Sequence, residues 1–85
     1  MEINEYLRLC ARTVEDLAPV IGPAYRGMIM THDRAGAWDQ AIPMLVGAIS
    51  EEGVAIPSAQ KENLRRLLVH MRAPLTYLEQ IRTTD

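Results

Sequence analysis

The sequence predicts an all-α fold, a small antiparallel bundle of four to five helices that forms a single helical domain over residues 1–85. Apolar residues recur at the three- and four-residue spacing of amphipathic helices, and no segment alternates apolar and polar residues over the length of a strand. The connections between these segments are short, which favours antiparallel neighbours. The composition, with 48% hydrophobic and 24% charged residues, is that of a globular protein with a thin core.

Residues 3–18 predict the first helix. Asn4 is the expected N-cap, because its side chain can accept a hydrogen bond from the N–H groups of the first turn. Pro19 ends the helix, since the residue before a proline is displaced from the helical region. The apolar stripe that we expect to be buried consists of Ile3, Leu7, Cys10, Val14 and Leu17.

The second helix is expected to begin at Pro23, whose missing N–H carries no penalty in a first turn. Its expected inner side consists of Tyr25, Met28, Ile29 and His32. Residues 33–36 predict a turn, after which a third helix begins near Ala37 and stops at Gly53, a residue suited to a left-handed C-terminal position. Pro43 lies inside this helix and predicts a local distortion, because proline removes a backbone hydrogen bond. The expected buried positions of the third helix are Trp38, Ala41, Ile42, Leu45, Ala48 and Ile49.

Residues 54–57 predict an extended connection, and Ser58 is the expected N-cap of a fourth helix. Its apolar stripe consists of Leu64, Leu67, Leu68 and Met71. The residues expected to face water are Lys61, Glu62, Arg65 and Arg66, with a supporting pair between Glu62 and Arg66. Pro74 ends or kinks this helix, and a short fifth helix is indicated by Leu75, Leu78 and Ile81. Residues 83–85 are expected to fray.

The sequence contains no set of residues that is typical of catalysis. Cys10 is the only cysteine and lies on the apolar stripe of the first helix, so we expect a small buried side chain rather than a reactive thiol. His32 and His70 end helical segments, where the helix dipole favours an imidazolium, and two distant histidines do not make a metal site. Phosphate-binding and zinc-binding motifs are missing. We therefore expect no enzyme activity, no catalytic residue, no cofactor and no metal.

The beginning of the sequence and its hydropathy predict a cytoplasmic protein. Glu2 and Glu5 stand where an export signal would need positive charge. Charged residues interrupt every apolar segment before it reaches the length of a membrane span. We accordingly expect neither a membrane nor a small molecule as the partner.

The net charge of −2 is divided unevenly along the chain. Residues 1–55 hold four arginines against eight acidic residues, whereas residues 56–85 hold five basic residues against three acidic ones. The fourth helix has a basic face, which leaves a small helical nucleic-acid-binding regulator as an alternative function. This face consists of Lys61, Arg65, Arg66 and Arg72. The negative charge of the whole domain argues against nucleic acid as the partner and favours an ordinary solvated helix face.

Four acidic residues bracket the third helix and suggest a binding surface. Glu51 and Glu52 are disfavoured at its C-terminal end, which carries partial negative charge, and a basic protein partner would compensate for this. Trp38 stands in the first turn, where it either packs against the end of the second helix or anchors an interface. The candidate partner-binding residues are Asp33, Trp38, Asp39, Glu51 and Glu52.

Residues 32–71 contain an Ala-Gly turn before tryptophan, an alanine and leucine helix that ends in Glu-Glu-Gly, a short link to a serine cap, and a leucine helix. In this order the segment resembles the small immunity proteins of Maf-type polymorphic toxin systems. The matching positions are Ala35, Gly36, Ala37, Trp38, Ala41, Leu45, Glu51, Glu52, Gly53, Val54, Ile56, Ser58, Leu64, Leu67 and Met71. Pro43 and residues 73–85 depart from the family pattern.

The resemblance implies a bacterial cytosolic immunity protein without catalysis of its own. Such a protein binds a cognate toxin domain, often at the toxin's active site, and neutralises it. A binder needs a stable scaffold and a complementary surface rather than reactive groups. The acidic surface around the third helix leads us to expect a basic toxin domain as the partner. A non-catalytic adaptor subunit is a further alternative.

Overall fold

Five α-helices and one short 3-10 helix make up the chain in a computed structural model, which describes all residues 1–85 and confirms the all-α prediction. The elements are α1 (Ile3–Leu17), η1 (Ala18–Val20), α2 (Pro23–Arg34), α3 (Trp38–Glu52), α4 (Ser58–His70) and α5 (Thr76–Glu79). The only β-type pairing is a single parallel bridge between Ile56 and Thr83. No helix combines the length and the apolar character needed to cross a membrane.

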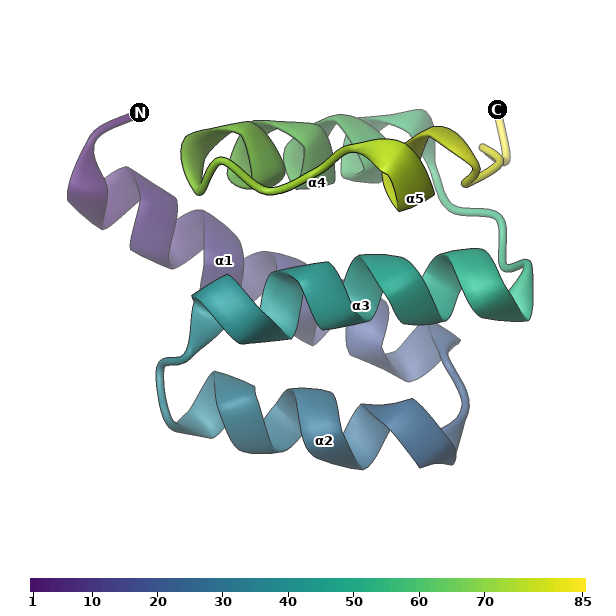
Figure 1. Ribbon diagram of the computed structural model, residues 1–85, viewed down its shortest axis with the longest axis horizontal. Helices are drawn as coiled ribbons and strands as arrows, with labels where there is room; N and C mark the ends of the chain where they lie inside the picture. Colours follow the sequence, from purple (N-terminus) through teal and green to yellow (C-terminus); the bar gives the residue numbers. More distant parts are fainter.

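α3 occupies the centre of the bundle and contacts α1, α2, α4 and α5 (Figure 1). α2 runs antiparallel to α3 along one side, and α4 with α5 lies along the other side (Figure 1). α1 crosses behind α3 and packs against α4 as well. This arrangement explains why the sequence of α3 is apolar around most of its circumference, since few of its positions can face water.

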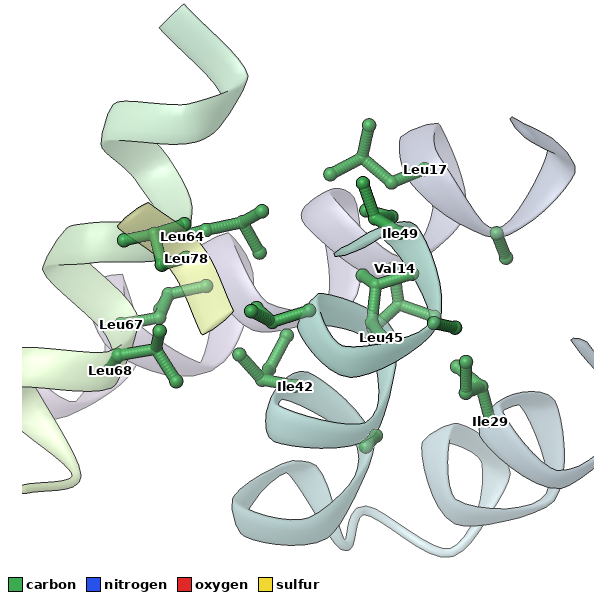
Figure 2. Close-up of a cluster of buried hydrophobic side chains, with 14 of the residues drawn as sticks. Val14, Leu17, Ile29, Ile42, Leu45, Ile49, Leu64, Leu67, Leu68 and Leu78 are labelled. Carbon is green, nitrogen blue, oxygen red and sulfur yellow. The ribbon is translucent and has the colours of Figure 1, made fainter. Parts of the chain in front are cut away.

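The buried apolar side chains form one continuous cluster of 19 residues. Figure 2 shows Ile42, Leu45 and Ile49 of α3 in the middle of this cluster. Each fully buried leucine or isoleucine stabilises the fold by about 1.5 to 3 kcal/mol. The neighbours that surround α3 in this view are Val14, Leu17, Ile29, Leu64, Leu67, Leu68 and Leu78.

The beginning of α1 differs from the sequence prediction in two ways. The N-cap is Glu2 rather than Asn4, because the Glu2 carboxylate accepts hydrogen bonds from the N–H groups of Asn4 (2.9 Å) and Glu5 (3.2 Å). Ile3 and Leu7 were expected in the core, but Ile3 is 58% exposed and Leu7 also reaches solvent. The physical reason is that the first turns of α1 project beyond the end of α3 (Figure 1), and α4 contacts them through Glu5 and Tyr6.

In α2 and α3 most of the expected features are present. Ile29 is buried as predicted, whereas Met28 is 52% exposed because α3 covers only one side of α2. α3 continues through Pro43 from Trp38 to Glu52 without a break. Gly53 ends α3 with a φ of 67°, as expected of a left-handed C-cap.

The last residues do not fray as predicted, because they pair with the connection before α4. The N–H of Ile56 donates to the carbonyl of Arg82 (3.1 Å), and the N–H of Thr84 donates to the carbonyl of Ile56 (2.9 Å). The Asp85 carboxylate accepts hydrogen bonds from both the N–H and the hydroxyl of Ser58, each at 2.8 Å. Ser58 is therefore the first residue of α4 rather than its N-cap, and Asp85 supplies the capping acceptor from the far end of the chain.

The charged residues of α4 also pair differently from the expectation. Glu62 pairs with Arg65 at 3.4 Å instead of Arg66, and Arg66 lies 3.9 Å from Glu5 of α1. Lys61 does not simply face water, because its ammonium donates to the carbonyl of Ile81 at 2.7 Å. The predicted basic face of α4 is thus partly used in holding α1 and the C-terminal residues.

The bonds from Ser58 favour the charged form of Asp85 and hold its pKa below the ordinary value of 3.8. Because the folded pKa is the lower one, Asp85 stabilises the fold above its ordinary pKa and loses this effect as the pH falls through the folded value. We expect Asp85→Asn to lower the melting temperature at neutral pH, and the difference from the parent protein to shrink in acid. Glu15→Gln, at an exposed carboxylate without a hydrogen bond, is the control. A pH-independent difference in melting temperature would contradict this role of Asp85.

Candidate functional site

The five candidate residues lie at the two ends of α3 rather than in one cluster. Asp33, Trp38 and Asp39 stand at its beginning, and Glu51 and Glu52 stand at its end. At a rise of 1.5 Å per residue, these two groups are separated by about 20 Å along the helix axis. The structure brings together Asp33 with Trp38, and Glu51 with Glu52, but not the two groups with each other.

Trp38 packs against the core, which is the first of the two alternatives that the sequence left open. Its ring is half-buried and packs against the hydrophobic cluster, and its indole N–H donates to the Asp33 carboxylate at 2.9 Å. Asp33 belongs to the last turn of α2, so this bond joins the end of α2 to the beginning of α3. Trp38 and Asp33 therefore have a structural role, whereas Asp39 is exposed on the first turn of α3, where the helix dipole favours an acid.

Glu51 and Glu52 interact with the beginning of α2. The Glu52 carboxylate accepts a hydrogen bond from the N–H of Gly22 at 2.8 Å, and the Tyr25 hydroxyl donates to the Glu51 carboxylate. Because α2 and α3 are antiparallel, the negative C-terminal end of α3 adjoins the positive N-terminal end of α2. The compensation that the sequence analysis assigned to a partner is thus supplied by α2, although both glutamates remain exposed.

The outer face of α3 contains two adjacent hollows, of about 460 Å³ and about 520 Å³, that are open to solvent. Gly47 and Tyr77 line both of them, so the two hollows form one surface feature that we call the α3 groove. The lining of the α3 groove includes Tyr25 of α2, Pro43, Met44, Gly47 and Glu51 of α3, and Tyr77 of α5.

Helical spacing and packing together explain why this strip of α3 is uncovered. Pro43, Gly47 and Glu51 follow each other at four-residue steps and so share one face of the helix. α2 and α5 lie on either side of this face, and no element lies over it (Figure 1). Gly47 keeps the floor open, because a Cβ added there would meet no atom within 4 Å. Core packing therefore does not require a glycine at position 47. A glycine inside a helix lowers the stability of the fold by about 0.5 to 1 kcal/mol relative to alanine.

The α3 groove is mostly apolar, and Glu51 is the only charged residue among those that line it. Tyr77 is 61% exposed, the most exposed large apolar or aromatic side chain of the protein. Asp39 stands one turn before Pro43 on the same face of α3, so that an acidic residue flanks the groove at each end. An apolar strip with a tyrosine and flanking acids suits a protein segment that has both apolar and basic side chains.

No family model, curated protein or solved structure significantly matches this chain.

Two titratable side chains of α1, Cys10 and Tyr6, have pKa values that burial raises. Cys10 is buried, and burial raises the pKa of its thiol above 9.0, which keeps the thiol protonated at neutral pH. Burial is also the main cause that raises the pKa of Tyr6 to about 12. The Tyr6 ring stacks on His70 at a centroid distance of 4.2 Å. No group of three or more His, Cys, Asp or Glu side chains is arranged to hold a metal ion.

Sequence reasoning did not identify Gly47 and Tyr77. A usable signal was present for Tyr77, since it falls outside the apolar stripe of Leu75, Leu78 and Ile81 and so had to be an aromatic residue at the surface. Gly47 gave a weaker signal, as a glycine inside a helix that has no turn at that point.

Trp38→Ala is expected to lower the free energy of unfolding by about 3 kcal/mol, the lower end of the range for aromatic truncation, because the ring is only partly buried. Urea unfolding followed by circular dichroism measures the change. Asp33→Asn, which keeps an oxygen to accept the indole N–H, is the milder control. An unchanged unfolding midpoint in Trp38→Ala would show that the ring does not support the core.

The hydrogen bond to Glu51 is the main cause that raises the pKa of Tyr25 above its ordinary value of 10.0. This bond stabilises the protonated phenol, so its contribution to folding is complete below pH 10 and is lost as the pH rises through the raised pKa. We expect Glu51→Gln to return the pKa of Tyr25 toward 10.0, as measured by NMR titration of its ring resonances. Glu15→Gln should leave this titration unchanged, and a Tyr25 pKa insensitive to Glu51→Gln would contradict the pairing.

Proposed function

We propose that this chain is a non-catalytic binding protein that inhibits a basic protein partner by seating part of it in the α3 groove. The partner class implied by the resemblance of residues 32–71 is the toxin domain of a polymorphic toxin, and the function is then that of an immunity protein. The observation that carries the proposal is the α3 groove itself, an open apolar strip with exposed Tyr77 and an acidic residue at each end.

The shape of the α3 groove supports a polypeptide as the ligand. The two hollows adjoin each other at Gly47 and Tyr77, and both are open to solvent. An apolar side chain of the partner would contact Pro43 and Met44, and Tyr77 would cover it from the side of α5. Tyrosine is enriched among the residues that dominate binding energy, because it buries a large apolar area and retains a polar hydroxyl.

The charges around the α3 groove support a basic partner. Glu51 lines the groove, Glu52 lies beside it, and Asp39 stands one turn beyond its other end. Complementary charges of this kind raise the association rate and fix the register of two proteins more than they increase affinity. The hydrogen bond from Tyr25 holds the Glu51 carboxylate at the groove, so that a basic side chain would meet a charge already in position.

The size of the molecule fits this role. A standard protein interface buries roughly 800 Å² on each partner, which is about a sixth of this protein's 4948 Å² surface. An interface of that area centred on Gly47 would reach both ends of α3. Asp39 and the exposed edge of Trp38, both candidate partner-binding residues, would then lie at the rim of the interface.

Gly47→Gln tests the α3 groove without weakening the fold. Glutamine has a better helix propensity than glycine, and the space above Gly47 is open, so we expect Gly47→Gln to fold and its side chain to occupy the groove. Affinity for the partner should fall by about tenfold or more, equivalent to about 1.4 kcal/mol. Calorimetric titration with a purified toxin domain encoded beside this chain measures the loss.

Gly27→Gln is the matched control, because Gly27 is an exposed helical glycine of α2 that also has no atom within 4 Å of an added Cβ and does not line the groove. Equal affinities of both variants would show that the partner binds elsewhere. In Asp39→Asn combined with Glu51→Gln, the association rate should fall and lose part of its dependence on salt. An association rate unchanged in this double variant would contradict a basic partner.

A further inference from the structure

A second hollow, separate from the α3 groove, lies between α1 and α4 and gathers three arginines. Its volume is about 210 Å³, and its lining consists of Glu5, Arg8, Leu9 and Arg12 of α1 with Arg66 of α4. It shares no residue with the α3 groove. The sequence predicted that Arg66 lies on the basic face of the fourth helix. It did not predict that Arg66 lines a hollow with Arg8 and Arg12, which belong to the acidic part of the chain.

Five of the nine lysine and arginine side chains are ion-paired or hydrogen-bonded within the fold. Arg26 donates to three backbone carbonyls, at 3.1, 3.2 and 2.6 Å. Lys61 and Arg82 each donate to one carbonyl, and Arg65 pairs with Glu62. Arg8 and Arg12 do neither, since no carboxylate lies within ion-pair distance of them and they donate no hydrogen bond.

The two unpaired arginines are also close to each other. Arg8 and Arg12 are four residues apart on α1, a spacing at which like charges destabilise a helix. Arg66 adds a third guanidinium, and its ion pair with Glu5 is long, at 3.9 Å. The hollow therefore contains three positive charges against one negative charge, and an anion bound there would relieve the repulsion.

We propose that this α1/α4 hollow binds a phosphate group, either inorganic phosphate or the phosphate of a small phosphomonoester. The excess of two positive charges matches the charge of −1.5 to −2 that a phosphomonoester carries near neutral pH. The planar fork of a guanidinium can donate two parallel hydrogen bonds to phosphate oxygens. Three arginines line this hollow, so each can donate in this way to the same phosphate. A volume of about 210 Å³ is sufficient for one phosphate group.

The small extent of the hollow favours a compact anion over nucleic acid. Binding to a nucleic-acid backbone draws on positive charge spread along several phosphates, whereas here the three arginines line one small hollow. Leu9 forms the apolar part of the lining. The α1/α4 hollow is thus a single small site in which positive charge dominates.

NMR titration of the full chain with inorganic phosphate tests the proposal, with sodium chloride and sodium sulfate at the same ionic strength as comparisons. We expect saturable shifts of the side-chain N–H resonances of Arg8, Arg12 and Arg66 with phosphate, weaker ones with sulfate and none with chloride. A parallel titration with O-phosphoserine distinguishes the two ligands. Tighter binding of O-phosphoserine supports a phosphomonoester, and tighter binding of inorganic phosphate supports the free ion. Shifts that grow linearly without saturation, or equally with chloride, would overturn the proposal.

Variants separate a specific site from general charge. Arg12→Gln should weaken phosphate binding by about tenfold, whereas Arg34→Gln, which removes an exposed charge from the end of α2, should leave it within about twofold. Glu5→Gln should strengthen binding severalfold, because it removes the competing carboxylate and releases Arg66. Equal losses in Arg12→Gln and Arg34→Gln, or preferential binding of a short DNA duplex over phosphate, would refute the site.

Discussion

The burial of α3 against four other helices is the interaction on which the rest of the structure depends. A chain of 85 residues can form only a thin core, and one helix covered on most sides is an efficient way to bury apolar surface. Ile42, Leu45 and Ile49 are fully buried because α1, α2, α4 and α5 each approach α3 from a different direction. The single strip of α3 that no element covers is, for the same reason, the most prominent groove of the molecule.

The antiparallel α2–α3 pair determines what the acidic residues do. It joins the end of α3 to the beginning of α2, so that Glu51 and Glu52 meet donors from Tyr25 and Gly22. Two carboxylates that would be unfavourable on an isolated helix end become favourable in the folded protein. They remain exposed, and Glu51 contributes charge to the α3 groove at no cost to the fold.

Long-range hydrogen bonds complete the helix ends that the local sequence leaves open. Asp85 caps the beginning of α4, and the Lys61 ammonium holds the carbonyl of Ile81. These bonds draw the last residues onto the bundle and use a cation that would otherwise face water. Four of the nine cations have no such partner, and of these Arg8 and Arg12 are the two that line a common hollow.

The sequence by itself determined the class of the fold, the number of helices and most of their boundaries. Apolar spacing, Pro23 and Gly53 are local signals, and a helix needs only local information to be located. The buried position of Cys10 and the helical content of residues 76–79 followed from the same spacing. Of the candidate site, the sequence indicated the acidic residues around α3 and the place of Trp38 beside the end of α2.

Only the tertiary structure decided which part of each apolar stripe is covered, and which distant groups meet. Ile3 and Met28 have the spacing of core residues but lie where no neighbouring helix reaches. The α3 groove with Gly47 and Tyr77, and the hollow that Arg12 and Arg66 both line, depend on how far each helix extends past its neighbour. Helical periodicity does not predict how far one helix extends past another. It indicates which residues share a face of a helix, but not which element packs against that face.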